Sequence, residues 1–451
     1  MRIKEDGMEF LSVTVGGFRN LKKTKILLDG SITSLVSTNN YGKSNFLDAV
    51  AFGTVFMNST PQARVRMMGD ESCMPLVPRL DEDDFTFEVE FHDAKLGEYQ
   101  FVRYGFAFAW RRDNGTGERI TEERIELNSK RGGNWSSYLR RDIGKYRPGH
   151  STQRCTRKIN LDSNQLAIDV LTAIDGIDIK PAIHSIRELR YGACYPLSTE
   201  GIMDDYPLEL AGQEGGVFSL SERDLPRSLF ELKKSHPDKY EEFQSIVCEL
   251  FPEIHDIDVV SSQLQPEQKQ RIEDQTQRLQ ETASTDDESQ VPYRIRDEVY
   301  RIFVTSSHLN QPVSVTRMSD GTKRVIWLVA RSVMADIAGV GLLGVEEVET
   351  GIHPRMMQDL LDAVQEVLGE TKVILTSHSP YLIQCLPFDS IYVGVPNDEG
   401  VASFATFEAG SVEGLSDAAY DRGMSAGEYI FALMSSGEDE EDILTSFLEA
   451  S

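Results

Sequence analysis

Hydrophobic and polar positions alternate along the first part of the chain and then change to a helical spacing. Apolar side chains occupy alternate positions or short runs in three segments, 8–15, 23–29 and 32–37. Both patterns are typical of β-strands. In segment 45–57, NFLDAVAFGTVFM, the apolar positions recur at helical spacing. The pattern therefore predicts three strands, a polar loop and a helix, in that order.

A second region of alternation covers residues 85–127. Its three segments read FTFEVEFH, YQFVRYGFAFAW and RITEERIEL, and the turn sequence DNGTG separates the last two. Strand patterns joined by a glycine-containing turn are typical of hairpins. We expect an antiparallel sheet here.

The middle of the chain is different. Residues 161–250 contain helical patterns such as QLAIDVLTAI, IHSIRELRYG and PRSLFELKKS. Residues 263–290 are almost all polar, which predicts a solvated helix leading into a flexible linker. From residue 296 strand patterns return, and apolar strands at 340–348, 371–379 and 390–395 alternate with helices. That alternation indicates a parallel sheet and places the chain in the α/β class.

Charge narrows the set of partners. The 451 residues carry a formal net charge of −27, so the chain repels nucleic acid on average and needs a local basic patch to bind it. Segment 130–158 is such a patch, because nine cations face one acid, Asp142, and Trp135, Tyr138 and Tyr146 lie between them. It is a candidate for binding a phosphate backbone, for pairing with the acidic surface of a neighbouring subunit, or for an inert sheet edge. The cations are Lys130, Arg131, Arg140, Arg141, Lys145, Arg147, Arg154, Arg157 and Lys158.

Other features of composition favour the cytoplasm. The five cysteines are scattered without a CxxC pair, which argues against a disulfide framework and a zinc site. We find no apolar run of the roughly 18 residues that a transmembrane helix needs, so no membrane association is expected. The acidic run 438–442 is either a solvated tail or a docking tail for a basic partner.

The polar loop after the third strand carries most of a phosphate-binding motif. In STNNYGKS, residues Gly42, Lys43 and Ser44 match the pattern G-x-x-x-x-G-K-[ST], but Ser37 occupies the position of the first glycine. Backbone N–H groups of such a loop cradle a phosphate, the lysine bridges the β- and γ-phosphates, and the serine hydroxyl binds Mg²⁺. The strand–loop–helix context makes this motif specific.

Three later stretches of the sequence contain further candidate residues for a nucleotide site. MSDGTKR, at 318–324, opens a helix with a serine and a glycine and predicts an anion site. GLLGVEE, at 341–347, ends an apolar strand in Glu346 and Glu347, one suited to Mg²⁺ and the other to polarising a water. VILTSHSP places His378 just after a strand. Each alone is more often a turn, a solvent-facing pair or a structural histidine, but their joint order favours a nucleotide site.

These stretches resemble the ABC-class ATPase heads of the SMC and OLD (overcoming lysogenization defect) families. The resemblance rests on MEFLSVTVGGFRNLKK, STNNYGKSNFLDAV, MSDGTKR, VEEVETGIHP and ILTSHSPYLI, in residues 1–127 and 291–395. It implies a two-lobed head that sandwiches ATP between two copies of the chain. The expected division is 1–160 and 291–400 for the two lobes, 161–290 for a mostly helical insertion with its linker, and 401–451 for C-terminal helices and the acidic tail.

The resemblance also assigns roles. Lys43 and Ser44 hold phosphate and Mg²⁺, and Ser319 and Gly321 contact the γ-phosphate across a head-to-head dimer. Glu347 is the expected catalytic base, His378 the γ-phosphate switch and Glu346 a metal ligand. The loop residues Asn39, Asn40, Gly42 and Asn45 complete the expected nucleotide-binding set.

Two departures from the family pattern bear on the reaction rate. A serine at position 37 is strained by about 1–3 kcal/mol if it keeps a glycine conformation. Glu346 replaces the usual aspartate, and its extra methylene shifts the metal or its water. Both predict slow or regulatory hydrolysis.

The segment after His378 is too short for the Toprim nuclease that many OLD proteins carry, so we expect a separate effector. By analogy, the chain resembles the ATPase subunit of anti-phage systems: Septu, with an HNH nuclease, is preferred over PARIS, with a Toprim nuclease. The alternatives are an SMC-like ATPase that repairs or remodels DNA, which needs long coiled-coil arms, and a nucleotide-binding scaffold that hydrolyses nothing.

Overall fold

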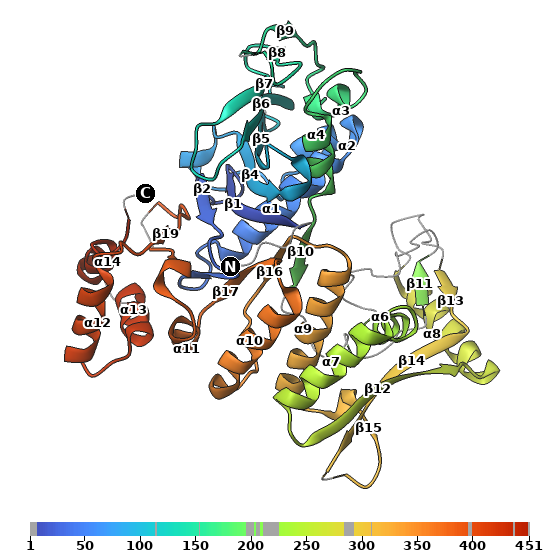
Figure 1. Ribbon diagram of the computed structural model, residues 1–451. Coiled ribbons are helices and arrows are strands. Elements are labelled where there is room, and N and C mark those ends of the chain that lie inside the picture. The colour runs from blue at the N-terminus through green and yellow to red at the C-terminus, as the bar shows by residue number, and fades with distance from the viewer. Residues whose placement is uncertain are drawn as a thin grey trace. The chain divides into compact units, whose positions relative to one another are not determined.

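The computed structural model describes residues 7–112, 115–152, 154–194, 203, 208–210, 225–283, 293–307, 309–395, 399–435 and 438–449 (Figure 1). The chain forms two compact units. The first comprises Met1–Tyr195, Gly339–Glu349 and Gly369–Ser451, and the second comprises Pro196–Ala338 and Thr350–Leu368.

The first unit contains an antiparallel sheet of eight strands in the order β2-β1-β4-β5-β6-β7-β8-β9. Its register places apolar side chains opposite each other, as in the pairs Val13↔Val89 and Val15↔Phe87, and these side chains are buried. The antiparallel sheet predicted from the alternation is therefore confirmed. The strands are β1 (Met8–Gly16), β2 (Thr24–Leu27), β4 (Phe85–Asp93), β5 (Phe101–Ala109), β6 (Arg119–Asn128), β7 (Ser136–Arg140), β8 (Lys145–Tyr146) and β9 (Arg157–Lys158).

A second sheet in this unit has the order β10-β16-β17-β3-β18-β19. All its pairings are parallel except that of β19 with β18, which confirms the parallel α/β sheet expected from the second half of the chain. Residues at the end of the predicted helical pattern 183–192 instead begin strand β10, so that part of the prediction is wrong. The strands are β3 (Ile32–Val36), β10 (Tyr191–Cys194), β16 (Leu342–Val345), β17 (Lys372–Ser377), β18 (Ile391–Val393) and β19 (Ala405–Thr406).

Helix α1 (Lys43–Asn58) packs against both sheets of the unit (Figure 1). On one side, a Cβ atom at Gly53 would lie 2.1 Å from the ring of Phe87 in β4, so only glycine permits this approach. On the other side, a Cβ atom at Gly344 in β16 would lie 3.1 Å from Leu47. The helix is therefore wedged between the sheets, and its buried face joins them into one core.

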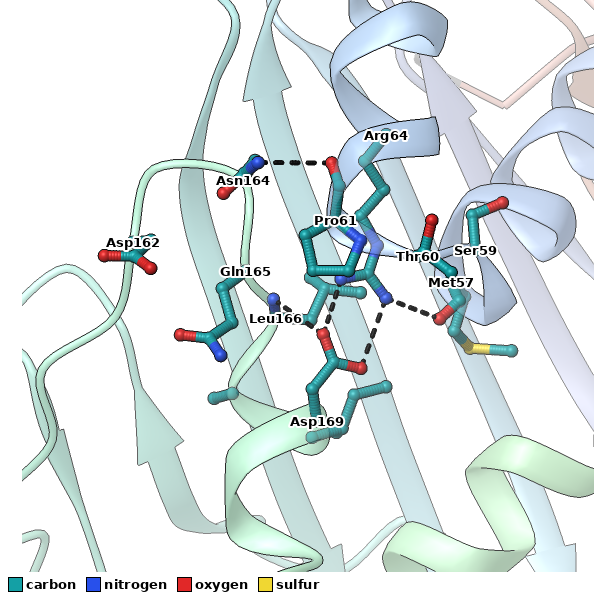
Figure 2. Close-up of polar contacts among 12 residues, drawn as sticks. Met57, Ser59, Thr60, Pro61, Arg64, Asp162, Asn164, Gln165, Leu166 and Asp169 are labelled. Atoms are coloured by element: carbon teal, nitrogen blue, oxygen red, sulfur yellow. Dashed lines mark hydrogen bonds and ion pairs between the residues drawn. The ribbon is translucent and has the colours of Figure 1, made fainter.

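The C-terminal end of α1 is held by charged side chains (Figure 2). Arg64, on α2 (Pro61–Met68), is fully buried and donates to the carbonyl oxygens of Phe56 and Met57 at 3.0 and 3.1 Å. Asp169, on α3 (Ala167–Leu171), forms ion pairs with Arg64 and with Arg187 on α4 (Lys180–Glu188). The last carbonyls of a helix lack partners within it, so these guanidinium groups stabilise the end of α1 opposite the phosphate loop.

The C-terminal helices of the first unit form a separate core. Leu444 of α14 is fully buried within it, although α14 begins with the acidic run 438–442. Beyond α14, the N–H of Glu449 donates to Thr406 O in β19 at 2.9 Å. Leu444 and the backbone at Glu449 are therefore packed into the first unit, and whether the acidic run 438–442 is a solvated tail or a docking tail for a basic partner stays a prediction. The helices are α11 (Pro380–Gln384), α12 (Val412–Asp421), α13 (Ala426–Ser435) and α14 (Glu438–Thr445).

The second unit combines small antiparallel sheets with helices. Strands β12, β14 and β15 form one sheet, and β11 and β13 form another. The polar stretch 263–290 forms α8, as predicted for its first part, while residues 284–290 of the expected linker lie outside the described residues. None of the helices in the described ranges is long and apolar enough to cross a bilayer. The elements are β11 (Leu208–Leu210), α6 (Leu225–Ser235), α7 (Pro237–Leu250), β12 (Ile254–Gln263), α8 (Pro266–Ala283), β13 (Tyr293–Ile295), β14 (Glu298–Ser306), β15 (Val313–Ser314), α9 (Asp320–Ile337) and α10 (Met357–Leu368).

Candidate nucleotide site

The phosphate-binding motif forms the turn between β3 and α1. The loop follows Val36, and α1 begins at Lys43. Asn40 and Gly42 adopt positive φ angles of 60° and 128°. A Cβ atom at Gly42 would lie 2.7 Å from Ala402 Cβ and 2.9 Å from Asn20 Oδ1, so the glycine is required both by its backbone conformation and by its neighbours. The N-terminus of α1, with its unpaired N–H groups, opens at this turn.

Ser37 does not carry the strain expected of it. The non-glycine residues with positive φ in the described ranges are Arg19, Asn40, Glu118 and Glu347, and Ser37 is not among them. Its side chain is fully buried, and its hydroxyl accepts a hydrogen bond from Lys43 Nζ at 3.1 Å. The expectation of a strained glycine conformation is therefore wrong for this loop, and the serine gives Lys43 a contact that a glycine cannot.

Lys43 lies at the centre of the site. Its Nζ donates to the carbonyl oxygens of Ser37 and Thr38, both at 3.0 Å, and lies 3.2 Å from His378 Nδ1. Burial lowers the pKa of Lys43 to about 8, although three glutamates, at positions 346, 347 and 349, oppose this shift. The tertiary structure thus brings together the predicted phosphate-binding lysine and the predicted switch histidine.

Glu346 and Ser44 form the candidate Mg²⁺ position. Glu346 follows β16 and is buried, and burial raises its pKa, while a hydrogen bond from the exposed Ser44 hydroxyl opposes that shift. No cluster of three or more histidine, cysteine or acidic side chains in the described residues has metal-binding geometry. Mg²⁺ usually takes one or two protein oxygens, with waters and substrate phosphates as its other ligands. The hydroxyl and carboxylate therefore fit an ion held jointly with a nucleotide.

Glu347 has an unusual backbone conformation. Its φ is 43°, and its N–H donates to the hydroxyl of Thr376 in β17 at 3.1 Å. A non-glycine residue with positive φ costs about 1–3 kcal/mol, and such strain is often found at functional sites. The half-exposed carboxylate lies 4.0 Å from His378 Nε2. Burial and the nearby Lys43 lower the pKa of His378, so its imidazole is neutral near pH 7.

The remaining predicted residues differ in their surroundings. Asn39 and Asn40 are exposed on the loop. The Asn45 amide donates to Asn20 Oδ1 at 2.7 Å, and its oxygen accepts from Arg19 at 2.8 Å. Its side chain therefore supports the loop from inside the protein.

The S-x-G residues belong to the second unit. Ser319 is exposed and caps α9 by accepting from the N–H of Thr322 at 3.2 Å. A Cβ atom at Gly321 would lie 2.2 Å from Gly351 O. Close packing within the second unit is thus enough to explain why position 321 is a glycine. The expected contact of Gly321 with a γ-phosphate stays a prediction.

Sequence reasoning missed several residues around the site. Asn20 donates to Tyr41 O at 2.9 Å, Thr376 holds Glu347, and Glu349 accepts from the N–H of His378 at 2.6 Å. All three lie within or beside the quoted family motifs, which was the available signal. Their roles depend on side-chain contacts between distant segments, which local patterns do not report.

Comparisons with known proteins cover different parts of the chain. Residues 204–384 match the family model described as "AAA domain, putative AbiEii toxin, Type IV TA system". That region contains the S-x-G motif, both strand-end glutamates and His378, but it begins after the phosphate loop.

Similar solved structures include an SMC head bound to the C-terminal winged-helix domain of ScpA, with 12% identity, a TM-score of 0.49, and 90% of this chain and 99% of that chain covered. Another is the SMC head domain from Thermotoga maritima, with 11% identity, a TM-score of 0.40 and coverages of 89% and 100%. A third is the recombination mediator protein RecF-ATPrS in the RecFOR pathway, with 14% identity, a TM-score of 0.39 and coverages of 88% and 98%.

Proposed function

We propose that this chain is an ATP-binding regulatory subunit that hydrolyses ATP slowly. The observation that carries the proposal is the convergence of Lys43, Glu347 and His378 at the N-terminus of α1, since the three residues come from separate segments of the chain. A lysine at a phosphate loop, a carboxylate and a histidine are the groups that phosphoryl transfer to water needs at one place.

Within this proposal each side chain has a role. The α1 N–H groups and Lys43 bind the β- and γ-phosphates and offset their negative charge. Glu347 accepts a proton from the water whose oxygen attacks the γ-phosphorus, while the bond from that phosphorus to the β-phosphate oxygen breaks and ADP leaves. Neutral His378 contacts the γ-phosphate as a hydrogen-bonding group. Mg²⁺, when bound by Ser44 and Glu346, supplies positive charge at the phosphate oxygens.

Two features of the site favour slow turnover. The buried Ser37 hydroxyl and the two loop carbonyls hold Lys43 in place, so a γ-phosphate must compete with them for the ammonium. Glu346 is one methylene longer than aspartate, so Glu346 and Ser44 would hold Mg²⁺ differently from a site with the shorter carboxylate. The restrained Lys43 and the longer Glu346 both favour a nucleotide-dependent switch over rapid hydrolysis.

We further propose that the site is completed by a second copy of the chain. Ser319 is exposed at the N-terminus of α9, where its N–H groups suit an anion. A head-to-head dimer would present this serine to the nucleotide on the partner, and two-fold dimers are the commonest closed assemblies.

The biological role we favour is control of a separate effector nuclease in a defence system against phage. An HNH effector, as in Septu, is the first choice and a Toprim effector, as in PARIS, the second. The matching family model, whose description reads "putative AbiEii toxin, Type IV TA system", supports a link to toxin–antitoxin systems and says nothing of an effector nuclease. The choice between effectors rests on the resemblance of the sequence.

The basic segment 130–158 is a weaker candidate for nucleic acid than its sequence suggests. Tyr138 and Tyr146 are buried, and Trp135 stacks on Arg103, so the interleaved aromatic rings are structural. Arg141 and Arg147 bind backbone carbonyl oxygens. Arg131 pairs with Asp29 and Arg140 with Asp142.

Five cations of that segment form no ion pair in the described part of the chain, and three of them, Lys145, Arg157 and Lys158, lie on β8 and β9 at the edge of the antiparallel sheet. They are Lys130, Lys145, Arg154, Arg157 and Lys158. Lys145 and Lys158 are directly opposed across β8 and β9, and like charges in that position repel each other. A phosphate backbone or an acidic surface of another subunit would relieve this repulsion, and we retain both as proposed partners.

The second candidate function is an SMC-like ATPase that acts directly on DNA. Such proteins need long coiled-coil arms. The longest helices in the described ranges, α8 and α9, have 18 residues each, and in α8 only Ile272 and Leu279 are large apolar residues at heptad spacing, which is far short of the sustained repeat that an arm needs. This observation favours the regulatory subunit.

Calorimetric titration with ATP and Mg²⁺ tests the proposal most directly. Wild-type protein should bind ATP, Lys43→Ala should not, and Lys130→Ala, which removes an exposed lysine far along the sequence, should bind like wild type. Equal ATP affinity of Lys43→Ala and wild type would refute the assignment of the phosphate loop.

A further inference from the structure

Glu349 is the least explained charged group beside the candidate site. It follows Glu347 by two residues and belongs to the same unit as Lys43 and His378. Its Oε1 accepts two hydrogen bonds, from the Ser377 hydroxyl at 2.9 Å and from the His378 N–H at 2.6 Å. One carboxylate oxygen therefore holds the backbone on which the switch histidine is carried.

The carboxylate of Glu349 holds the loop around His378 both directly and through the Ser377 hydroxyl. Besides donating to Glu349, the Ser377 hydroxyl accepts from the N–H of Ser379 at 2.9 Å. Hydrogen bonds to an ionised acceptor are roughly twice as strong as those between neutral groups. The carboxylate thus organises three consecutive residues at the end of β17, and the middle one places its Nδ1 3.2 Å from Lys43 Nζ.

The other oxygen of the same carboxylate has no hydrogen-bond partner in the described part of the chain. This atom, Glu349 Oε2, is buried. Leaving a buried acceptor unsatisfied costs about 1–3 kcal/mol, and more for a charged group, so each such atom in a folded protein calls for a reason. The charge of Glu349 also acts to raise the pKa values of both Lys43 and His378.

We propose that Glu349 is a positioning residue for ATP hydrolysis, with a separate task for each oxygen. Oε1 holds His378 at the γ-phosphate, and Oε2 accepts a hydrogen bond from a water bound beside that phosphate. Glu347 remains the base that takes the proton. The inference rests on the proposed ATPase function and adds to it a residue for which the sequence suggested no role.

A purely structural cap would require only Oε1. It would stabilise the turn after β17 whether or not nucleotide is bound, and it would leave the choice between ATP and ADP unaffected. The positioning role makes a different prediction, because His378 contacts only a nucleotide that has a γ-phosphate.

The variants Glu349→Ala, Glu349→Gln, His378→Ala and the double variant Glu349→Ala/His378→Ala separate these roles. Glu366→Gln, at an exposed position on α10, is the matched control for loss of one negative charge. Affinities for ADP and for the non-hydrolysable analogue adenylyl imidodiphosphate are measured by calorimetry with Mg²⁺. ATP turnover and melting temperature are measured on the same samples.

We expect Glu349→Ala to reduce the preference for the triphosphate analogue over ADP about fivefold or more, to the level of His378→Ala. The double variant should show no greater loss, because Glu349 acts through His378 in binding. Glu349→Gln keeps an oxygen acceptor for the loop and should retain the preference within about twofold. Its kcat should still fall about 10- to 100-fold at unchanged KM, because an amide NH₂ cannot accept from the water.

Several results would overturn the inference. One is a Glu349→Ala variant that matches Glu366→Gln in nucleotide preference and kcat. Another is a double variant whose losses in preference for the triphosphate analogue multiply, since Glu349 would then act on binding independently of His378. If Glu349→Ala fails to fold, an unchanged kcat of Glu349→Gln is sufficient to reject it. If wild type binds ADP and ATP equally weakly, the proposed function and this inference both fail, whereas normal binding with inert variants rejects the inference alone.

Discussion

Tyr41 and Ser403, 362 residues apart in the chain, exchange two hydrogen bonds. The Tyr41 hydroxyl donates to Ser403 O at 2.9 Å and accepts from Ser403 N–H at 3.1 Å. Tyr41 immediately precedes Gly42 in the phosphate loop, and its ring packs edge-on against Phe404. The conformation of the loop is therefore tied to the segment that leads into the C-terminal helices.

Tyr41→Phe should weaken ATP binding and lower stability. The substitution keeps the ring but leaves Ser403 without its side-chain partner, and a buried hydrogen bond contributes about 0.5–1.5 kcal/mol each. We expect an affinity loss of about three- to tenfold in calorimetry and a lower melting temperature. The matched control is Tyr420→Phe, at a side chain that is 83% exposed, which should change neither quantity. Equal affinities for the two variants would show that the contact does not shape the loop.

ATP binding should be coupled to proton uptake near pH 8.5. Burial lowers the pKa of Lys43 to about 8, so part of the population carries a neutral amine at that pH, and bound phosphates favour the charged ammonium. Calorimetry in buffers with different heats of ionisation should show a fraction of a proton taken up per site, decreasing at pH 7. Lys130→Ala, at an exposed lysine outside the loop, should retain the uptake. Its absence in wild type would mean that Lys43 is fully charged before binding.

The same group affects stability with a definite sign. Because the folded-state pKa of Lys43 lies below the unfolded value of 10.5, the unfolded chain binds more protons between about pH 8 and 10.5. Lys43 therefore opposes folding below pH 8, and this cost decreases as pH rises through that window. Lys43→Met should remove this contribution, so its advantage in melting temperature over wild type should shrink between pH 8 and 10. An advantage independent of pH would contradict the sign.

Mixing two inactive variants tests the shared site. Lys43→Ala removes the phosphate ligand, and Ser319→Ala removes the residue proposed to act on the partner's nucleotide. In a mixed dimer one site combines both defects and the other is intact, so activity should return to a fraction of the wild-type rate. Native mass spectrometry confirms that mixed oligomers form. If they form and remain inactive, the site is complete within one chain or absent.

The rate should rise when the two departures from the family pattern are reversed. Ser37→Gly removes one of the contacts that hold Lys43, and Glu346→Asp restores the shorter carboxylate beside Ser44. Wild-type turnover should lie well below about 10 s⁻¹, the median for enzymes, and the double variant should exceed it several-fold. Since Ser37 is unstrained in the structure, the melting temperature should not rise with Ser37→Gly. An unchanged rate would remove the physical basis for a slow ATPase.

The basic sheet edge discriminates between two proposed partners. The double substitution Arg157→Glu/Lys158→Glu reverses charge at two exposed positions. If the edge binds a phosphate backbone, affinity for duplex DNA should fall, and the slope of log affinity against log salt should decrease by about one to two. If it binds an acidic subunit surface, the oligomer should dissociate in analytical ultracentrifugation instead. If neither changes, the edge is inert.

Local sequence patterns predicted the secondary-structure elements and the type of site. Alternation at 85–127 predicted β4, β5 and β6, and the motif ending in Lys43 and Ser44 predicted a loop between a strand and a helix. These features are readable because burial of one face imposes a period on neighbouring residues. The glycine, lysine and serine of the loop are likewise constrained over a few positions.

Contacts between segments that are distant in sequence became apparent from the tertiary structure alone. Strand β3 lies between β17 and β18, and this pairing brings Lys43 to His378, while Tyr41 reaches Ser403 and Glu349 takes up the loop after β17. Whether Ser37 is strained, and whether Arg141 and Arg147 face solvent or carbonyl oxygens, also depended on neighbours far away in sequence. Hydrophobic periodicity records that a strand is buried and not which strand lies beside it, because parallel pairing is selected by packing of the whole sheet.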